Sequence, residues 1–278
     1  MNLPYVIPRL VRHFLPEKIT RALLLRGFII RPGLETRLPE EAALRYQTDL
    51  QAAGVSMAGK HVLVFGYGGR FNLGCQLLKL GAAHITLCEY AVKPDEAANA
   101  RLMPEFGKVL FQRDGKIYPR SEYVTLLEGD IRELVKQQEI RKADIVLSTS
   151  VFEHLADPAG ILTALVFLTQ PEGLHLHYID LRDHFFKYPF EMLTYSLSTW
   201  KSWLNPTSNL NRWRLQAYEE IFHNLFSDVA IYVSERDMTA WGKTSARILP
   251  EFITGNLLID SIAQIRVTAQ GLKNPGAL

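Results

Sequence analysis

From Val62 onward, short apolar segments alternate with stretches of helical character, and this alternation leaves few architectures open to the chain. It is typical of βα units built around a parallel sheet. Strands are predicted over 61–65, 84–88, 123–127, 144–148, 173–179, 230–233 and 265–268, and helices over 73–80, 131–139, 159–168 and 215–226. We therefore predict a doubly wound α/β fold with a mostly parallel, seven-stranded sheet.

The segments outside this alternation define the predicted domain organisation. Residues 56–278 form the sheet domain, and residues 1–55, which several prolines interrupt, form a helical cap over one edge of it. Residues 95–122 are an insertion, read as a helix followed by a hairpin or loop. Residues 185–214, rich in aromatic and amide side chains, are predicted to be a substrate lid.

Charge and cysteine content exclude several classes of protein. The net charge of +2 argues against a nucleic-acid-binding protein, which usually carries a strong basic excess. Cys75 and Cys88 are too few for a disulfide framework, and they show no zinc-ligand spacing. The longest uncharged stretch, 158–171, is too short to span a bilayer, and no signal peptide is evident. We expect a cytoplasmic protein.

The first 31 residues are distinctly basic. They contain six basic side chains and one acidic one, a local charge of +5. One interpretation is a helix that makes weak contact with an anionic membrane through Leu10, Val11, Phe14 and Leu15. The favoured interpretation is a helix packed on the main domain with its arginines in solvent.

A glycine-rich turn follows the first predicted strand. Gly66, Gly68 and Gly69 allow the backbone to turn sharply and to approach a ligand closely. Glu89 ends the second strand, where a carboxylate can accept both hydrogen bonds of a ribose diol. Phe71 stands where a dinucleotide fingerprint needs glycine. The turn therefore predicts an adenosyl ligand without a pyrophosphate.

At this point the chain resembles the class I S-adenosylmethionine-dependent methyltransferases, from about Lys60 to Leu181. The similar segments are 62–69 (VLVFGYGG), 87–90 (LCEY), 128–131 (EGDI), 144–148 (DIVLS) and 150–158 (SVFEHLADP), which has the family's EH-x-x-DP turn. Two features depart from the pattern: the turn reads GYGGRFNLG, and 41 residues separate Glu89 from Asp130. The resemblance implies a Rossmann-like fold, S-adenosyl-L-methionine as cofactor and a small-molecule acceptor.

The resemblance also assigns cofactor contacts by position. It implies that the three glycines contact the methionine moiety, that Glu89 binds the ribose, and that Asp130 binds the adenine amine. The remaining implied contacts come from Tyr90, Ile131, Thr149 and Ser150, the last two on the sulfonium side. Two alternatives stay open: Asp130 caps the helix that begins at Ile131, or Tyr90 is a core aromatic.

The acceptor site is predicted just past the fifth strand. His184 is the candidate general base there, with Asp183 or Asp180 to orient it, unless Asp183 and His184 only cap a helix. A divalent metal on these three residues is disfavoured, and no metal is predicted. Candidate substrate contacts are His154, Tyr188, Trp203 and Trp213, and Arg31 and Tyr46 are expected to line the pocket. The aromatics suit a sugar, or they form the core of the lid.

These observations favour an enzyme that methylates a hydroxyl, or less readily an amine, of a polar small molecule such as a sugar or glycosylated metabolite. One alternative is an NAD(P)-binding oxidoreductase, although its catalytic residues are not evident. Another is a non-catalytic adenosyl-binding module, attached to a membrane or a partner through its basic first 31 residues.

Overall fold

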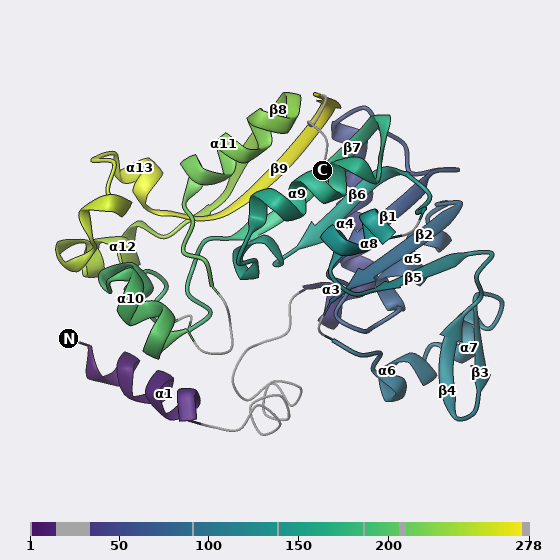
Figure 1. Cartoon of the computed structure of the whole chain (residues 1–278), viewed down its shortest axis with the longest axis horizontal. Helices are drawn as coiled ribbons and strands as arrows, with labels where there is room; N and C mark the ends of the chain where they lie inside the picture. The colour runs from purple at the N-terminus through teal and green to yellow at the C-terminus, as the bar shows by residue number, and fades with distance from the viewer. Residues whose placement is uncertain are drawn as a thin grey trace.

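A seven-stranded sheet runs through the centre of the molecule (Figure 1). The structure is a computed structural model that describes residues 2–14, 34–90, 92–137, 139–185, 187–205 and 210–273. The strand order is β5-β2-β1-β6-β7-β9-β8. The strands are β1 (His61–Phe65), β2 (His84–Glu89), β5 (Val124–Glu128), β6 (Ala143–Thr149), β7 (Thr169–Asp180), β8 (Phe226–Arg236) and β9 (Ile262–Leu272).

Six of the seven strands run in the same direction, and β9 runs in the opposite one. The strands β5, β2, β1, β6 and β7 pair in parallel, whereas β9 is antiparallel to both β7 and β8. All five residues of β1 are buried, as expected for a central strand that helices cover on both faces. The predicted mostly parallel, seven-stranded α/β sheet is confirmed.

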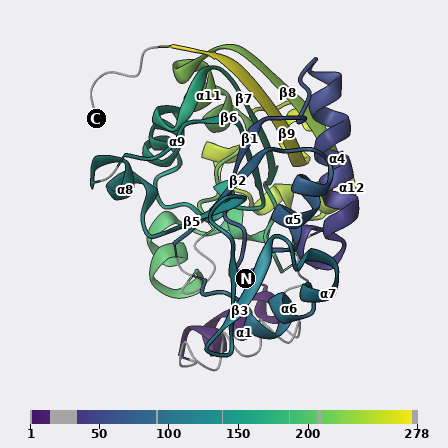
Figure 2. The same ribbon diagram turned by 90° about the vertical axis from the view of Figure 1, so that its right-hand side faces the viewer.

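Helices form a layer on each face of the sheet (Figure 2). On one face, α4 (Pro39–Ala52) and α5 (Asn72–Lys79) pack in a core with Val62, Val64 and Leu87. The other face carries α8 (Ile131–Gln137), α9 (Pro158–Phe167) and α11 (Leu215–Leu225). The parallel strands are therefore sandwiched, and their carboxyl ends open at one edge between the two layers.

The insertion between β2 and β5 carries a second, two-stranded sheet, and Phe106, Leu110 and Ile117 join it to the core on the α4–α5 face of the main sheet. It consists of α6 (Glu96–Ala100), α7 (Met103–Phe106) and a hairpin of β3 (Leu110–Arg113) with β4 (Lys116–Pro119). Asp114 and Gly115 both have positive φ, as the tight two-residue turn of a hairpin requires. Helices followed by a hairpin agree with one of the two forms predicted for this segment.

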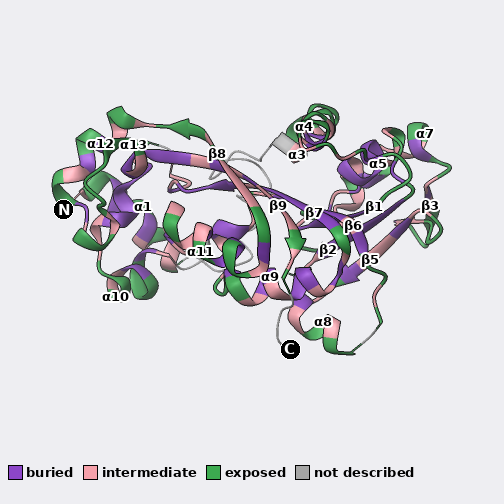
Figure 3. Cartoon of the chain, turned by 90° about the horizontal axis from the view of Figure 1, so that it is seen from above, coloured by how far each residue is buried: buried purple, intermediate pink, exposed green. Residues whose placement is uncertain are grey.

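A third hydrophobic cluster lies beside the sheet, at the end where β8 and β9 are joined. The helices that contribute to it are α1 (Leu3–Phe14), the π-helix η3 (Trp200–Leu204) and α12 (Met238–Thr244), with the short turns η2 (Glu191–Thr194) and η5 (Pro250–Phe252). The other short elements are α3 (Leu34–Arg37), η1 (Phe152–His154), α10 (Leu197–Thr199), η4 (Ser245–Arg247) and α13 (Leu257–Asp260). Tyr5, Phe190, Trp200 and Trp241 form the centre of the cluster. Buried residues continue from the sheet into this cluster (Figure 3).

One expectation for the first helix is wrong. Arg9 was expected in solvent, but it is buried and forms an ion pair with Asp183. Leu15, Lys18, Arg21, Arg26 and Arg31 lie outside the described residues. Among the described helices, none combines the length and the apolar character that a membrane span needs.

Candidate active site

The glycine turn leads from β1 into α5 at the carboxyl edge of the sheet. Gly66, Gly68 and Gly69 all have positive φ, between 66° and 79°, a conformation that favours glycine. A Cβ atom on Gly66 would overlap the side chain of Val151, which lies just beyond β6. The turn is therefore both left-handed and closely packed against the loop of a neighbouring strand.

Glu89 holds this turn against the end of β2. One carboxylate oxygen accepts a hydrogen bond from the Gly68 N–H at 3.0 Å, and the other accepts one from the Tyr90 N–H at 3.0 Å. A carboxylate oxygen can accept more than one hydrogen bond, so these bonds to the backbone are compatible with a ligand at the same carboxylate. Tyr90 is 76% exposed, so the interpretation of it as a core aromatic is wrong.

Tyr67, inside the turn, is a candidate site residue that the sequence analysis did not single out. Its hydroxyl oxygen is buried and has no hydrogen-bond partner among the described residues. Burial, followed by the charges of Glu128 and Glu89, raises the pKa of Tyr67. A buried hydroxyl without a partner is costly, so a polar ligand at the turn would stabilise it.

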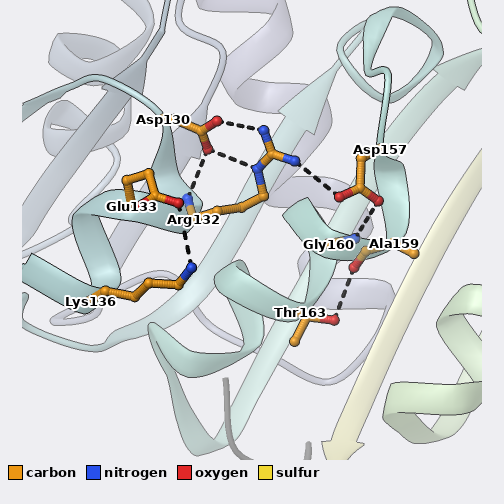
Figure 4. A network of polar contacts seen from close by, with 8 residues as sticks. All are labelled: Asp130, Arg132, Glu133, Lys136, Asp157, Ala159, Gly160 and Thr163. Atoms are coloured by element: carbon orange, nitrogen blue, oxygen red, sulfur yellow. Dashed lines mark hydrogen bonds and ion pairs between the residues drawn. The ribbon is translucent and has the colours of Figure 1, made fainter.

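Asp130 lies between β5 and α8 in a network of charged groups (Figure 4). Its carboxylate accepts from the backbone N–H of Arg132 and from the guanidinium, whose Nη2 is 2.5 Å from Oδ2. Hydrogen bonds from Arg132 lower the pKa of Asp130. Arg132 also reaches Asp157, which caps α9 through the Gly160 N–H. The predicted capping role of Asp130 at α8 is therefore present, and Ile131 beside it is buried in the core.

The end of β6 contributes Thr149 and Ser150. The Thr149 hydroxyl is 2.6 Å from the hydroxyl of Tyr46 on α4, which fixes its side chain. Ser150 has a φ of 52°, and its N–H donates to the Tyr178 carbonyl on β7. A residue other than glycine in this conformation is strained, and such strain clusters at functional sites. Both residues lie at the same sheet edge as the glycine turn.

His184 forms its polar contact with Glu153 rather than with the two predicted aspartates. Its Nε2 is 3.8 Å from a Glu153 oxygen, and its ring lies 4.7 Å from that of His154. Burial alone would lower the pKa of His184, but Glu153, together with the charges of Asp180 and Asp183, outweighs burial and the pKa is raised. Glu153 is 3% exposed, and its oxygens have no partner within hydrogen-bond distance among the described residues.

The orienting role expected of Asp180 and Asp183 needs correction, because both carboxylates are bonded elsewhere. Asp180 accepts from the guanidinium of Arg182 at 2.8 Å. Asp183 is fully buried and accepts from Tyr5, Arg9 and the Phe185 N–H. The three residues weighed from the sequence as metal ligands, Asp180, Asp183 and His184, are not the group that could share an ion. Among the described residues, the side chains whose ligand atoms lie within 4.8 Å of one another are Glu153, His154 and His184.

Neither a protein-family model nor a curated protein matches the sequence. Solved structures do match. One is a chain from the Haloferax volcanii complex of the Trm112 methyltransferase activator with a methyltransferase, at 16% identity, covering 94% of this chain and 98% of that one, with a TM-score of 0.50. Another is a geranyl diphosphate methyltransferase in complex with S-adenosylmethionine, at 11% identity, covering 85% and 86%, with a TM-score of 0.51. This chain has the class I methyltransferase fold.

Within this methyltransferase fold, the predicted substrate aromatics do not meet in one pocket. Tyr188 packs edge-on against Tyr5, and Trp213 packs on Tyr218. Trp203 is 50% exposed and lies beside His13 of α1. Tyr188 agrees with the alternative interpretation, in which aromatics of 185–214 form the core of a helical lid, because it packs against the third hydrophobic cluster. Only His154 of the four lies beside His184.

The structure instead places a cavity of about 290 Å³ at the carboxyl edge of the methyltransferase sheet, where β6 and β7 end. Its lining includes Arg45, Thr149, Ser150, Tyr178, Asp180 and Gln264. Arg45 and Gln264 were not predicted, because α4 and β9 meet this edge only through the tertiary fold. Tyr46 is buried and reaches the site through Thr149, and Arg31 lies outside the described residues.

Proposed function

We propose that this protein is an S-adenosylmethionine-dependent methyltransferase. The observation that carries the proposal is Glu89, which lies at the end of β2 and holds the left-handed glycine turn through the Gly68 N–H. A carboxylate in this position suits the two hydroxyls of a ribose. The unpartnered Tyr67 hydroxyl nearby offers a further polar contact for an adenosyl ligand.

The cofactor supplies a methyl group activated on a sulfonium, so the protein mainly has to position the acceptor. The Thr149–Ser150 turn and the cavity beside it would place the acceptor in line with the methyl group. His184 does not line this cavity, but Asp180 does, and its charge helps to raise the pKa of His184. In its neutral form His184 would take the proton of an acceptor hydroxyl as that oxygen forms its bond to the methyl carbon. Glu153 would stabilise the imidazolium that results.

A hydroxylated acceptor such as a sugar suits the cavity best. Arginine and amide groups donate hydrogen bonds there, Asp180 accepts them, and Tyr178 presents an aromatic ring. This mixture of donors and acceptors complements a polyol, whose hydroxyl groups both donate and accept. The support therefore comes from Arg45, Tyr178 and Gln264 rather than from Trp203 and Trp213.

The oxidoreductase alternative is weakened by the start of α5. Phe71 stands where a dinucleotide fingerprint has glycine; it is 1% exposed, and its N–H donates to the Asn99 side chain. The Phe71 N–H is therefore already bonded, and the Phe71 side chain occupies the volume that glycine would leave open. A pyrophosphate would need both that N–H and that volume.

Isothermal titration with S-adenosylhomocysteine tests the cofactor assignment, with NAD as the competing ligand. We expect binding of S-adenosylhomocysteine that weakens by about tenfold or more in Glu89→Ala, because a charge-assisted pair of hydrogen bonds is lost. Glu139→Ala, an exposed glutamate that follows α8 at the opposite edge of the sheet, is the matched control. Preference for NAD, or equal affinity in both variants, would contradict the proposal.

Turnover separates an enzyme from a non-catalytic adenosyl-binding module. We expect His184→Ala to retain S-adenosylhomocysteine affinity and to lose methyl transfer to hydroxylated acceptors, by about 10²-fold or more for a general base. Binding without methyl transfer to any acceptor in the wild-type protein would favour the module.

A further inference from the structure

The first helix, α1, is anchored to the domain by one of its faces. Tyr5 is fully buried and donates a hydrogen bond to Asp183, and Arg9 donates to Asp183 and to the Leu204 carbonyl. The Arg9 guanidinium also lies over the rings of Tyr5 and Trp200. This face fixes the orientation of α1, so its other face points in a defined direction.

That outer face is a stripe of large apolar side chains. Leu3, Ile7, Val11 and Phe14 are spaced by four, four and three residues, which aligns them along one side of a helix. They are 51%, 54%, 56% and 72% exposed, respectively. A helix that is apolar on both its inner and its outer side usually has a partner on each. In the described structure the outer side of α1 has none.

Trp203 extends the stripe onto the neighbouring helix. It is 50% exposed, and its ring is 5.5 Å from that of His13, at the end of α1. Figure 1 shows α1 at the margin of the molecule, below α10. Tryptophan is enriched where proteins meet the bilayer interface, because its ring is apolar and its N–H is polar.

Positive charges predominate in and after α1. The helix α1 contains no acidic residue, and Lys201 is exposed two residues before Trp203. Arg12 and His13 at the end of α1 are half-buried, and the Nε and Nη2 atoms of Arg12 are buried. The sequence that follows, residues 15–31, has four basic side chains and one acidic one. Apolar side chains flanked by positive charge match an anionic lipid surface better than the mixed charges of a typical protein partner.

We propose that Leu3, Ile7, Val11, Phe14 and Trp203 form a docking surface for an anionic membrane. The apolar stripe enters the headgroup boundary, and the basic groups contact lipid phosphates. This attachment would hold the methyltransferase-fold domain at the bilayer while the sheet domain stays in water. The inference rests on α1 and η3 and is independent of the proposed methyl transfer.

Vesicle co-sedimentation of the full chain tests the proposal. We expect binding to phosphatidylcholine vesicles that contain phosphatidylglycerol, weaker binding to phosphatidylcholine alone, and a decrease as salt screens the charges. The double substitution Ile7→Asp and Val11→Asp should reduce the bound fraction by about tenfold or more, because both residues would be charged within the interface. The matched control is Ile253→Asp with Leu258→Asp, which places the same charges at exposed apolar positions elsewhere.

The substituted positions are exposed, so the variants should fold, and an unchanged melting temperature and circular dichroism spectrum would verify this. Equal vesicle binding by the α1 variant and the control would overturn the proposal. It would also be overturned if the protein bound no vesicles but formed a dimer that Val11→Asp dissociated, since the stripe would then face a second copy. Titration with S-adenosylhomocysteine tests the proposed methyl transfer, and vesicle binding tests the membrane surface. Failure of one proposal can therefore be told from failure of the other.

Discussion

The pKa values of the histidines in the sheet are shifted in the opposite direction from that of His184 at the sheet edge. In the sheet, a chain of hydrogen bonds joins Ser148, His177, His175 and Thr169, over distances of 2.7, 3.1 and 2.8 Å. Burial lowers the pKa of His177 to about 3 and that of His61 to about 4. At the edge, by contrast, the pKa of His184 is raised.

Burial does not account for this difference, because His184 is itself largely buried. The deciding group is Glu153, a carboxylate that the fold encloses without a hydrogen-bond donor of its own among the described residues. Where the neighbours are hydroxyls and other imidazoles, histidine stays neutral and joins strands. Where the neighbour is an enclosed carboxylate, histidine can carry a proton. The same side chain is thus structural in one place and a candidate acid–base group in the other.

The largest expected effect is acid destabilisation through the sheet histidines. The unfolded chain binds protons at histidine below about pH 6.5, whereas folded His61 and His177 bind them only near pH 4 and 3. The free energy of unfolding should therefore fall as pH drops from about 6.5 to 4.5, by roughly 1.4 kcal/mol per pH unit for each such histidine. Urea denaturation across this range measures it, and a flat profile would show that these histidines are protonated in the folded state.

The next effect comes from cutting the hydrogen-bond chain in the sheet. His177→Phe keeps an aromatic ring against Phe152 and Phe222 but removes the partner of the Ser148 hydroxyl and of the His175 Nδ1 atom. We expect a loss of about 1–3 kcal/mol of unfolding free energy at neutral pH, and a shallower acid dependence. His223→Phe, on the exposed side of α11, serves as the control. A loss in the control as large as in His177→Phe would contradict this account.

At the edge, Glu153→Gln should remove the group that raises the pKa of His184. Because burial remains, we expect that pKa to fall. Proton NMR of the imidazole should show the fall directly, and the acidic limb of the rate profile should move to lower pH. Since a raised pKa stabilises the folded state below about pH 6.5, this contribution should also disappear there. The exposed control Glu220→Gln should leave the titration of His184 unchanged. If Glu153→Gln also left it unchanged, Glu153 would not be the cause of the difference between His184 and the histidines of the sheet.

The smallest effect is expected at the partly exposed charges of Figure 4. Arg132 is 39% exposed and pairs with Asp130 and with Asp157, itself 48% exposed. Solvent screens such pairs, so Arg132→Gln should lower the unfolding free energy by less than about 1 kcal/mol. Thermal denaturation is sufficient to measure this. If Arg132→Gln lowered the unfolding free energy as much as His177→Phe, these exposed charges would stabilise the fold as strongly as the buried hydrogen bonds of the sheet.

The sheet was predictable because its strands carry their own signal. Apolar runs such as 62–65 and 145–147 identify central strands, Gly66 follows the end of β1, and Glu89 ends β2. The helices α12 and α13, between β8 and β9, were not predicted, because they are short and acquire their stability from tertiary packing. Trp241 of α12 packs in the cluster of α1 and the π-helix, and Ile259 of α13 packs against the core of the sheet.

The site was only partly predictable for a related reason. Chain proximity suggested Asp180 and Asp183 as partners of His184, but an arginine from the adjacent sequence and one from α1 bind these carboxylates. Glu153 lies 31 residues earlier and becomes a neighbour only because β6 and β7 pair in the sheet. Periodicity predicts which residues reach the sheet edge, whereas partner choice there depends on side-chain packing that no local pattern encodes.

The bonds between α1 and Asp183 also bear on how the chain is made. Tyr5 and Asp183 are 178 residues apart, so α1 leaves the ribosome long before its anchor has been synthesised. At a synthesis rate of roughly 5–20 residues per second, the helix waits for about ten seconds or more without its partner. During that interval both of its apolar sides are uncovered. Docking of α1 is therefore a late step of folding, and the nascent chain must be protected from aggregation until Asp183 emerges.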